Sequence, residues 1–266
     1  MPFVEARDGA RVYYEVHGSG PAVLFVHGSG GHHMAWWQQV SALRQTYTTV
    51  TVDLRGFGRS SSSTTGGPLD ARLFVDDITA VLDEVAAQGV TRAVLVGQSI
   101  GAAAALKAAL RTPARVAGVV LAHSLGGVDH PELAALVKAD RAAAETMPVL
   151  DRLLSPAFQR ERPDKAFLFQ QMGTFNTAKM ADLTNLTSDG PRPDDLAAAG
   201  FPILLLAGEL DAVLSATTVR KAGELLPGVA VDVVPEGPHS MYFERPDLFN
   251  AALVRFLGSV YAEVTA

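Results

Sequence analysis

Residues Leu95–Leu106 have the sequence LVGQSIGAAAAL, which is the strongest indication of the fold of this chain. An apolar run ends at Gly97, Ser99 stands at the centre of a Gly-x-Ser-x-Gly spacing, and an alanine-rich helical pattern follows at once. This order predicts a sharp turn from a strand into a helix, where Gly97 and Gly101 leave room that a side chain would fill. The plainer interpretation is a serine that caps a helix beside two packing glycines. The rest of the chain decides between the two.

On such a turn Ser99 is placed to act as a nucleophile. The amides at the start of the helix surround it, and the backbone N–H of Ile100 is expected to point to where an oxyanion would form. A serine hydroxyl is a weak nucleophile at neutral pH, so it needs a base and a further group that orients the base. We therefore predict Ser99 as the nucleophile and Ile100 as one donor to the oxyanion.

Candidates for the base and its partner lie downstream. Asp211 follows the apolar run PILLLAGEL, and His239 follows VAVDVVPEG. Both come after the ends of predicted strands, where open α/β sheets build their sites. The order Ser, Asp, His along the chain differs from the orders found in the other two common serine-protease scaffolds. We expect His239 to be the general base and Asp211 to orient it, with Glu209 as a competing acid that spacing alone does not exclude.

A second oxyanion donor is expected from the glycine-rich run FVHGSGG at residues 25–31. Glycines let the backbone approach a substrate closely. We assign the donor to the N–H of Ser29, with Gly28 as the alternative, and expect the His27 side chain to orient the loop. A phosphate-binding loop is the weaker interpretation, because the run opens neither a G-x-G-x-x-G nor a Gly-Lys-Ser/Thr motif.

Short β-type runs alternate with longer helical patterns along the chain. This alternation is typical of an α/β fold with a mostly parallel central sheet and helices on both faces. The predicted strands are Arg11–Val16, Ala22–Val26, Thr48–Asp53, Ala93–Val96, Val116–Ala122, Ile203–Ala207 and Val229–Val234. The predicted helices are Ala71–Gln88, Gly101–Arg111, Thr217–Leu226 and Pro246–Tyr261.

The pattern changes between residues 124 and 200, where no convincing β run occurs. Glu132–Met147 and Lys165–Leu186 have helical patterns instead. A long segment without strands inside a sheet domain is usually functional. We therefore expect a helical cap at 124–200, inserted into an α/β core formed by 1–123 and 201–266.

Composition and charge exclude several classes of protein. The length of 266 residues suits one domain with an insertion, and the net charge of −6 with scattered basic residues argues against nucleic-acid binding. Cysteine is absent, so a disulfide framework or a thiolate site is excluded. No apolar stretch approaches the roughly 18–20 residues that cross a bilayer, and no signal-peptide pattern is present, so a cytoplasmic location is expected. The serine-rich run at 60–67 is predicted to be a flexible surface connection.

Neither a cofactor nor a metal ion is expected. Besides His27 and His239, the histidines are His17, His32, His33, His123 and His130. Only His32 and His33 are adjacent, and the H-E-x-x-H spacing of a zinc helix does not occur.

Several segments together resemble the α/β-hydrolase superfamily over essentially the whole chain. These segments are HGSGG, DLRGFGRS, GQSIG, GELDAV and PEGPHSMYFERPDLFN. By this resemblance Ser99, Asp211 and His239 form a catalytic triad, while Ser29 and Ile100 supply the oxyanion hole. The resemblance also implies that the cap covers the substrate pocket.

Within that superfamily the chain is most similar to small carboxylesterases, lactonases and carbon–carbon hydrolases. Serine at position 99 argues against haloalkane dehalogenases and epoxide hydrolases, which use aspartate there. The HGSGG loop departs from the HGGG loop of hormone-sensitive-lipase-like esterases, which argues against bulky tertiary-alcohol substrates.

The resemblance implies an enzyme of the carboxylesterase type, which cleaves a small-molecule ester or lactone through an acyl-enzyme intermediate. We expect a monomer or a homodimer, and a cap rich in Phe and Met favours an uncharged substrate. Three alternatives remain open at this point. They are a carbon–carbon bond hydrolase, a cofactor-free oxygenase or perhydrolase, and a hydrolase-like ligand receptor with slow turnover.

Overall fold

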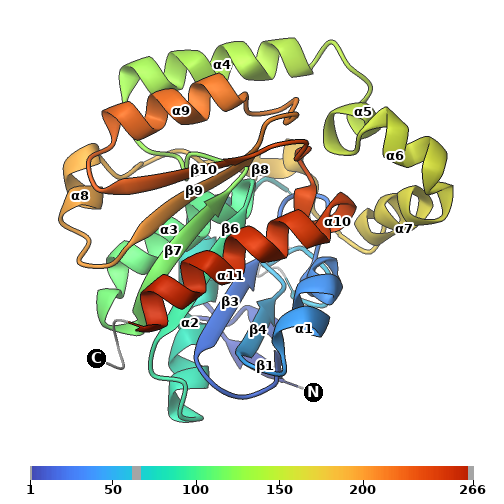
Figure 1. Ribbon diagram of the computed structural model, residues 1–266. Helices are drawn as coiled ribbons and strands as arrows, with labels where there is room; N and C mark the ends of the chain where they lie inside the picture. The colour runs from blue at the N-terminus through green and yellow to red at the C-terminus, as the bar shows by residue number, and fades with distance from the viewer. Residues whose placement is uncertain (1, 62–66, 263–266) are drawn as a thin grey trace.

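A computed structural model describes residues 2–61 and 67–262 and contains an eight-stranded sheet. The strand order is β1-β2-β4-β3-β6-β7-β9-β10. The strands are β1 Phe3–Glu5, β2 Arg11–His17, β3 Ala22–Val26, β4 Thr48–Val52, β6 Ala93–Gln98, β7 Val116–Ala122, β9 Ile203–Gly208 and β10 Val229–Val234. The pairs β1–β2 and β2–β4 are antiparallel, whereas all pairs from β4 to β10 are parallel (Figure 1). The predicted α/β class with a mostly parallel sheet is confirmed.

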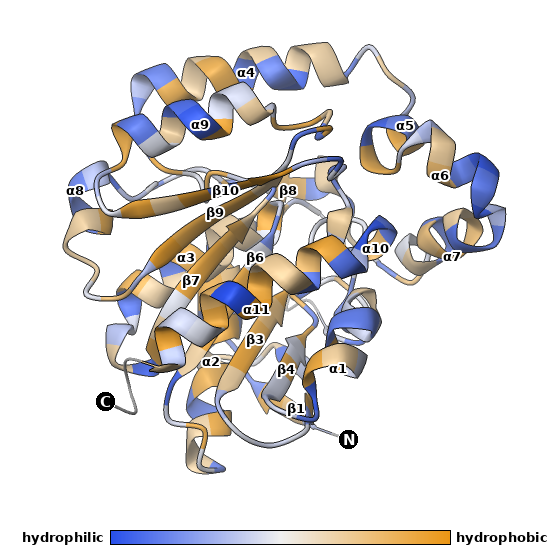
Figure 2. Cartoon of the chain, in the orientation of Figure 1, coloured by the Kyte–Doolittle hydropathy of each residue, from blue (hydrophilic) through white to orange (hydrophobic). Residues whose placement is uncertain are grey.

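The central strands are buried on both faces. Every residue of β3, β6, β7 and β9 is buried, which explains their continuous apolar sequences. One face of the sheet packs against α2 (Phe74–Ala87) and α3 (Ile100–Arg111). The other face packs against α1 (Trp37–Leu43) and α11 (Pro246–Ala262). In Figure 2 the hydrophobic colour is concentrated on the central strands.

Seven of the eight strands coincide with the predicted runs to within two residues at each end. The first strand, β1, was not predicted, and it is only three residues long. The flexible connection predicted at 60–67 falls mainly on residues 62–66, which lie outside the described part of the chain.

Most of the helices between residues 124 and 200 begin at a proline. They are α4 Pro131–Ala144, α5 Val149–Leu153, α6 Pro156–Glu161, α7 Pro163–Gly173 and α8 Pro193–Ala197. Proline suits the first helical turn, because its missing N–H would have no partner there. The prediction of one helix over Lys165–Leu186 was wrong in extent. The observed helix α7 ends at Gly173, and Leu183–Thr184 form a short strand, β8, that pairs with β5 (Leu69–Asp70).

Of these helices, α5, α6 and α7 lie beyond the end of the sheet where the parallel strands finish (Figure 1). In Figure 1, α4 runs beside α9 (Ala216–Leu225), while α5, α6 and α7 gather next to α10 (Met241–Glu244). The ring of Phe243 in α10 contacts Phe158 in α6 and Phe169 in α7, with ring centroids 6.3 and 5.1 Å away. The short 3-10 helices are His33–Trp36, Ala71–Leu73, Pro113–Arg115 and Met180–Asp182. None of the helices in the described residues is long and apolar enough to span a membrane.

Candidate active site

Ser99 lies on a strained turn between β6 and α3. Its backbone has φ 52° and ψ −115°, a conformation that L-residues other than glycine rarely adopt. The flanking glycines allow this turn, because a Cβ on Gly97 would lie 2.5 Å from the Cα of Ala102. A Cβ on Gly101 would likewise lie 2.5 Å from the carbonyl oxygens of Val26 and His27. The predicted strand-to-helix turn is therefore present, and it exposes Ser99 at the end of the sheet.

Neighbouring backbone holds the turn in place. The N–H of Ser99 donates to the carbonyl of Ala122, the last residue of β7, at 3.0 Å. Ile100 is the first residue of α3, and amides in the first turn of a helix have no acceptor within the helix. The Ile100 N–H is thus available to a ligand beside Ser99.

The glycine-rich loop after β3 packs directly against this turn. A Cβ on Gly28 would lie 3.4 Å from the Ser99 Cβ and 3.2 Å from the amide carbon of Gln98. His27 is buried and holds the loop from both sides. Its Nε2 accepts from the N–H of Leu54 (3.1 Å), so its Nδ1–H donates to the carbonyl of Gly28 (2.8 Å). Burial lowers the pKa of His27 to about 4, so it is neutral at physiological pH and orients the loop.

Asp211 and His239 meet beyond the ends of β9 and β10. The Nδ1–H of His239 donates to the Asp211 carboxylate, 2.9 Å from Oδ1 and 3.0 Å from Oδ2. Oδ1 also accepts from the backbone N–H groups of Val213 (2.8 Å) and Leu214 (3.0 Å). Burial by itself raises the pKa of Asp211, but the adjacent His239 and the hydrogen bonds outweigh it and hold that pKa below its ordinary value. The carboxylate therefore stays ionised.

Glu209, the competing acid, lies elsewhere. Its side chain is half exposed, and Oε1 pairs with the guanidinium of Arg220 at 3.2 Å. The acid that contacts His239 is Asp211.

The second ring nitrogen of His239 faces the turn that carries Ser99. Because Nδ1 donates to Asp211, Nε2 carries the free lone pair. This Nε2 lies 3.5 Å from the amide nitrogen of Gln98, the residue before Ser99. The structure thus gathers Ser99, His239 and Asp211 at one edge of the sheet, with the loop of Gly28 and Ser29 alongside.

His123 is a buried neighbour of Asp211 that the sequence analysis did not place in the site. Its Nδ1 lies 2.9 Å from Asp211 Oδ2, and its ring is 5.5 Å from that of His239. A signal was available, because His123 directly follows the last residue of β7 and so shares the strand-end edge with Ser99 and Asp211.

Two clusters in the described part of the chain bring histidine and aspartate ligand atoms within 4.8 Å of one another. They are His32, His33 and Asp53, and His123, Asp211 and His239. In both clusters the carboxylate accepts a hydrogen bond from histidine Nδ1. A metal ion would have to replace these protons.

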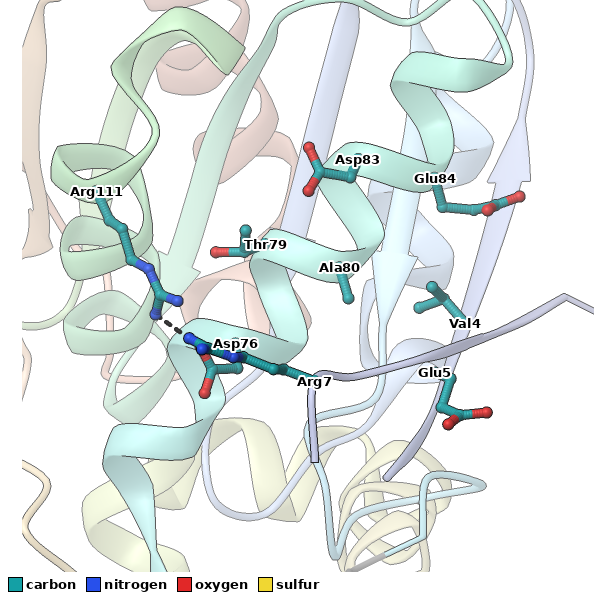
Figure 3. Close-up of a pocket in the computed structure, with 9 residues that line it drawn as sticks. All are labelled: Val4, Glu5, Arg7, Asp76, Thr79, Ala80, Asp83, Glu84 and Arg111. Atoms are coloured by element: carbon teal, nitrogen blue, oxygen red, sulfur yellow. Dashed lines mark ion pairs between the residues drawn. The ribbon is translucent and has the colours of Figure 1, made fainter. Parts of the chain in front are cut away.

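A surface groove of about 470 Å³ lies away from this site, between β1, α2 and the end of α3 (Figure 3). Acidic and basic side chains line it, and Arg111 pairs with Asp76 at 2.6 Å. No residue of the strand-end site takes part in this groove.

Comparison with known proteins is consistent with this geometry. Residues 23–252 match the model of a family described as the alpha/beta hydrolase family. The chain is 31% identical to the putative carbamate hydrolase RutD of Variovorax paradoxus (strain S110), with 94% of this chain and 97% of the relative covered.

Solved structures have the same fold. Est816, described as an N-acyl homoserine lactone degrading enzyme, is similar with a TM-score of 0.75 and 28% identity over 96% of this chain and all of that one. A thermophilic esterase from Thermogutta terrifontis has a TM-score of 0.79 over 97% of this chain and 98% of its own. At 24% identity, this second likeness concerns the fold alone.

Proposed function

Because the chain belongs to the α/β-hydrolase family, we propose that it is a serine hydrolase that cleaves a carboxylic ester or lactone through an acyl-enzyme intermediate. Ser99 is the nucleophile, His239 the general base and Asp211 the group that orients His239. The observation that carries this proposal is the hydrogen bond between His239 Nδ1 and Asp211 (2.9 Å), formed beside a serine held at φ 52°.

In the first half-reaction the Ser99 hydroxyl attacks the substrate carbonyl while His239 Nε2 takes its proton. The positive charge that develops on the imidazole is stabilised by the buried Asp211 carboxylate. The tetrahedral intermediate then collapses, and His239 donates the same proton to the leaving alkoxide. In the second half-reaction water attacks the acyl carbon and gives its proton to His239. The second tetrahedral intermediate then collapses, His239 returns this proton to the Ser99 oxygen, and the carboxylic acid leaves.

The oxyanion would be bound by two backbone donors. The N–H of Ile100 begins α3, whose dipole favours negative charge at this end. The N–H of Ser29 follows Gly28, which packs against the Ser99 Cβ. Donors on backbone that is already fixed need no rearrangement as the charge develops.

Residues 124–200 would form the cap of this site, inserted between the two parts of the core. Some of its apolar side chains, such as Phe169 and Met172, are buried against the core. Phe175 is 68% exposed instead, and its ring lies 6.1 Å from that of His32, next to the glycine-rich loop. An aromatic side chain in this place supports an uncharged acyl or alcohol group as substrate.

The names of the relatives suggest that carbamates, as well as esters and lactones, should be considered as substrates. A putative carbamate hydrolase and a lactone-degrading enzyme are among them, and carbamates, lactones and esters all present a carbonyl to the same nucleophile. Carbamates therefore belong in the test together with esters and lactones.

The test is hydrolysis of a panel of p-nitrophenyl esters, small lactones and aryl carbamates by the wild type and by Ser99→Ala. We expect many turnovers per site in the wild type, a loss on the order of 10⁶-fold in Ser99→Ala, and an acyl adduct on Ser99 by mass spectrometry. Ser259→Ala is the control, because Ser259 lies on the exposed face of α11 and its hydroxyl donates to the carbonyl of Phe256 within that helix. Turnover that survives in Ser99→Ala would refute the proposal.

A further inference from the structure

The triad carboxylate is shared by two histidines. His239 Nδ1 lies 2.9 Å from Asp211 Oδ1, and His123 Nδ1 lies 2.9 Å from Oδ2. Both rings and the carboxylate are buried. The proton transfers derived above use only one imidazole, so the second requires its own explanation.

We propose, building on the serine hydrolase function, that His123 is a positioning residue that holds Asp211 through Oδ2 and divides the charge of its carboxylate between two imidazoles. The backbone N–H groups of Val213 and Leu214 hold Oδ1. With His123 on the other oxygen, the carboxylate is fixed against rotation about its side-chain bonds. His239 is thereby kept in one orientation toward Ser99.

The backbone at His123 is shaped for this contact. Its φ of 56° lies in the left-handed region, where histidine is several-fold more frequent than most residues. Its N–H donates to the carbonyl of Leu206 in β9 at 2.8 Å, which ties the turn to the strand that leads to Asp211. A left-handed residue directly after a strand turns its side chain out of the strand's regular alternation.

His123 is neutral in this arrangement. An ionised carboxylate only accepts hydrogen bonds, so Nδ1 of His123 carries the proton. Its Nε2 is buried and has no hydrogen-bond partner among the described residues. Protonation there would leave a charged N–H unpaired in the interior, which is costly. Burial lowers the pKa of His123 more than the adjacent Asp211 raises it.

A neutral donor on Oδ2 weakens the attraction between Asp211 and the His239 cation. When His239 takes the serine proton, the Asp211 charge stabilises the resulting cation, and a hydrogen bond from His123 withdraws part of that charge. Removal of the His123 donor should therefore strengthen the interaction between Asp211 and the His239 cation. Among the residues that the structure describes, the titratable groups in contact with Asp211 are His123 and His239. On α4, the nearby Asp140 accepts from the Ser215 N–H (2.9 Å) instead.

The experiment compares His123→Leu with His123→Asn, two side chains of nearly equal shape. Only asparagine can donate from the position of Nδ1, and it also tolerates positive φ. The titration midpoint of His239 is measured by NMR on protein with ¹⁵N-labelled histidine and no substrate, and the acid limb of kcat/KM is measured separately. His130→Leu and His130→Asn are the matched controls, since His130 precedes α4 and is not a partner of Asp211.

In His123→Leu we expect the midpoint and the acid limb to move to higher pH by about one unit, with kcat reduced and KM little changed. In His123→Asn the midpoint and the acid limb should stay within a few tenths of a pH unit of the wild-type values. The control variants His130→Leu and His130→Asn should not differ from the wild type in either quantity. Equal midpoints in the wild type and His123→Leu would overturn the proposal. An equal displacement in the Leu and Asn variants would also overturn it, because packing alone would then explain the effect.

The wild-type spectrum keeps the proposal testable if His123→Leu does not fold. Two downfield Nδ1–H signals are expected, one from His239 and one from His123, and a signal from His239 alone would overturn the proposal. These spectra need no turnover. Failure of the NMR test would leave the hydrolase proposal untouched, whereas absence of Ser99-dependent hydrolysis would count against that function and not against the shared carboxylate.

Discussion

The side-chain amide of Asn176 donates to the carbonyl of Gly31 at 3.1 Å, which bonds the segment after α7 to the glycine-rich loop beside Ser99. The amide oxygen of Asn176 accepts from the N–H of Gly58 at 3.0 Å. The adjacent Thr177 reinforces this link, because its N–H and hydroxyl both donate to the carbonyl of Gly56 (3.1 and 3.0 Å). One amide thus connects residues of the proposed cap to two loops of the core.

We expect Asn176→Leu, which keeps the shape and removes both hydrogen bonds, to lower the free energy of unfolding by about 1–3 kcal/mol. It should also lower kcat/KM on the best ester several-fold, because the loop that carries the Ser29 N–H is less firmly held. Gln170→Leu on the exposed face of α7 is the control. Stability and kcat/KM equal to wild type in Asn176→Leu would show that this link is dispensable.

Asp211 and Glu209 give a direct test of the triad acid. Asp211→Asn should reduce kcat on the order of 10⁴-fold, because an asparagine cannot stabilise the histidine cation and favours the wrong tautomer of His239. Glu209→Gln should leave kcat near the wild-type value, since Glu209 pairs with Arg220 at the surface. Steady-state kinetics on one ester decides the matter, and a larger loss in Glu209→Gln than in Asp211→Asn would reverse the assignment.

Replacement by alanine should have opposite effects on protein stability at Gly97 and at Gly258. In Gly97→Ala the new Cβ would lie 2.5 Å from the Cα of Ala102, so the turn at Ser99 cannot form without backbone movement. We expect loss of hydrolysis with a clear loss of stability. In Gly258→Ala the Cβ meets nothing within 4 Å inside the helix α11, and we expect a gain of up to about 1 kcal/mol with unchanged activity. Thermal and urea unfolding measure both, and tolerance of Gly97→Ala would contradict the packing described here.

Buried neutral histidines should make the protein less stable in acid. Burial lowers the pKa of His27 from 6.5 to about 4. Between these two values the unfolded chain binds the proton and the folded chain does not, so stability falls as the pH drops from 6.5 toward 4. The difference in pKa corresponds to about 3 kcal/mol for full protonation of the unfolded state.

The measurement is urea unfolding of the wild type and of His27→Gln at pH 8, 6, 5 and 4.5. The loss of stability on acidification should be smaller in His27→Gln, which has no proton to gain at this position. His130→Gln serves as the control. Parallel curves for the wild type and His27→Gln would mean that His27 does not contribute to the acid dependence.

Local sequence patterns predicted the α/β class, seven strands of the central sheet and the position of Ser99 at a strand-to-helix turn. These features depend on local patterns, since apolar runs that are buried on both faces and the Gly-x-Ser-x-Gly spacing are visible in any short window. The order of Ser99, Asp211 and His239 along the chain also followed from the sequence, together with their position after strand ends. Local patterns were weaker between residues 165 and 186, where apolar residues continue past Gly173 although the helix stops there.

Which side chains contact one another depends on the folded sheet. Glu209 and Asp211 are two residues apart, and it is the turn after β9 that sends one to Arg220 at the surface and the other to His239. His123 is 88 residues from Asp211. Its position after a strand indicated which end of the sheet it occupies, but only the folded sheet shows that the ends of β7 and β9 lie side by side. Strand order is set by packing the whole sheet, so contacts across the edge of that sheet arise only once the chain has folded.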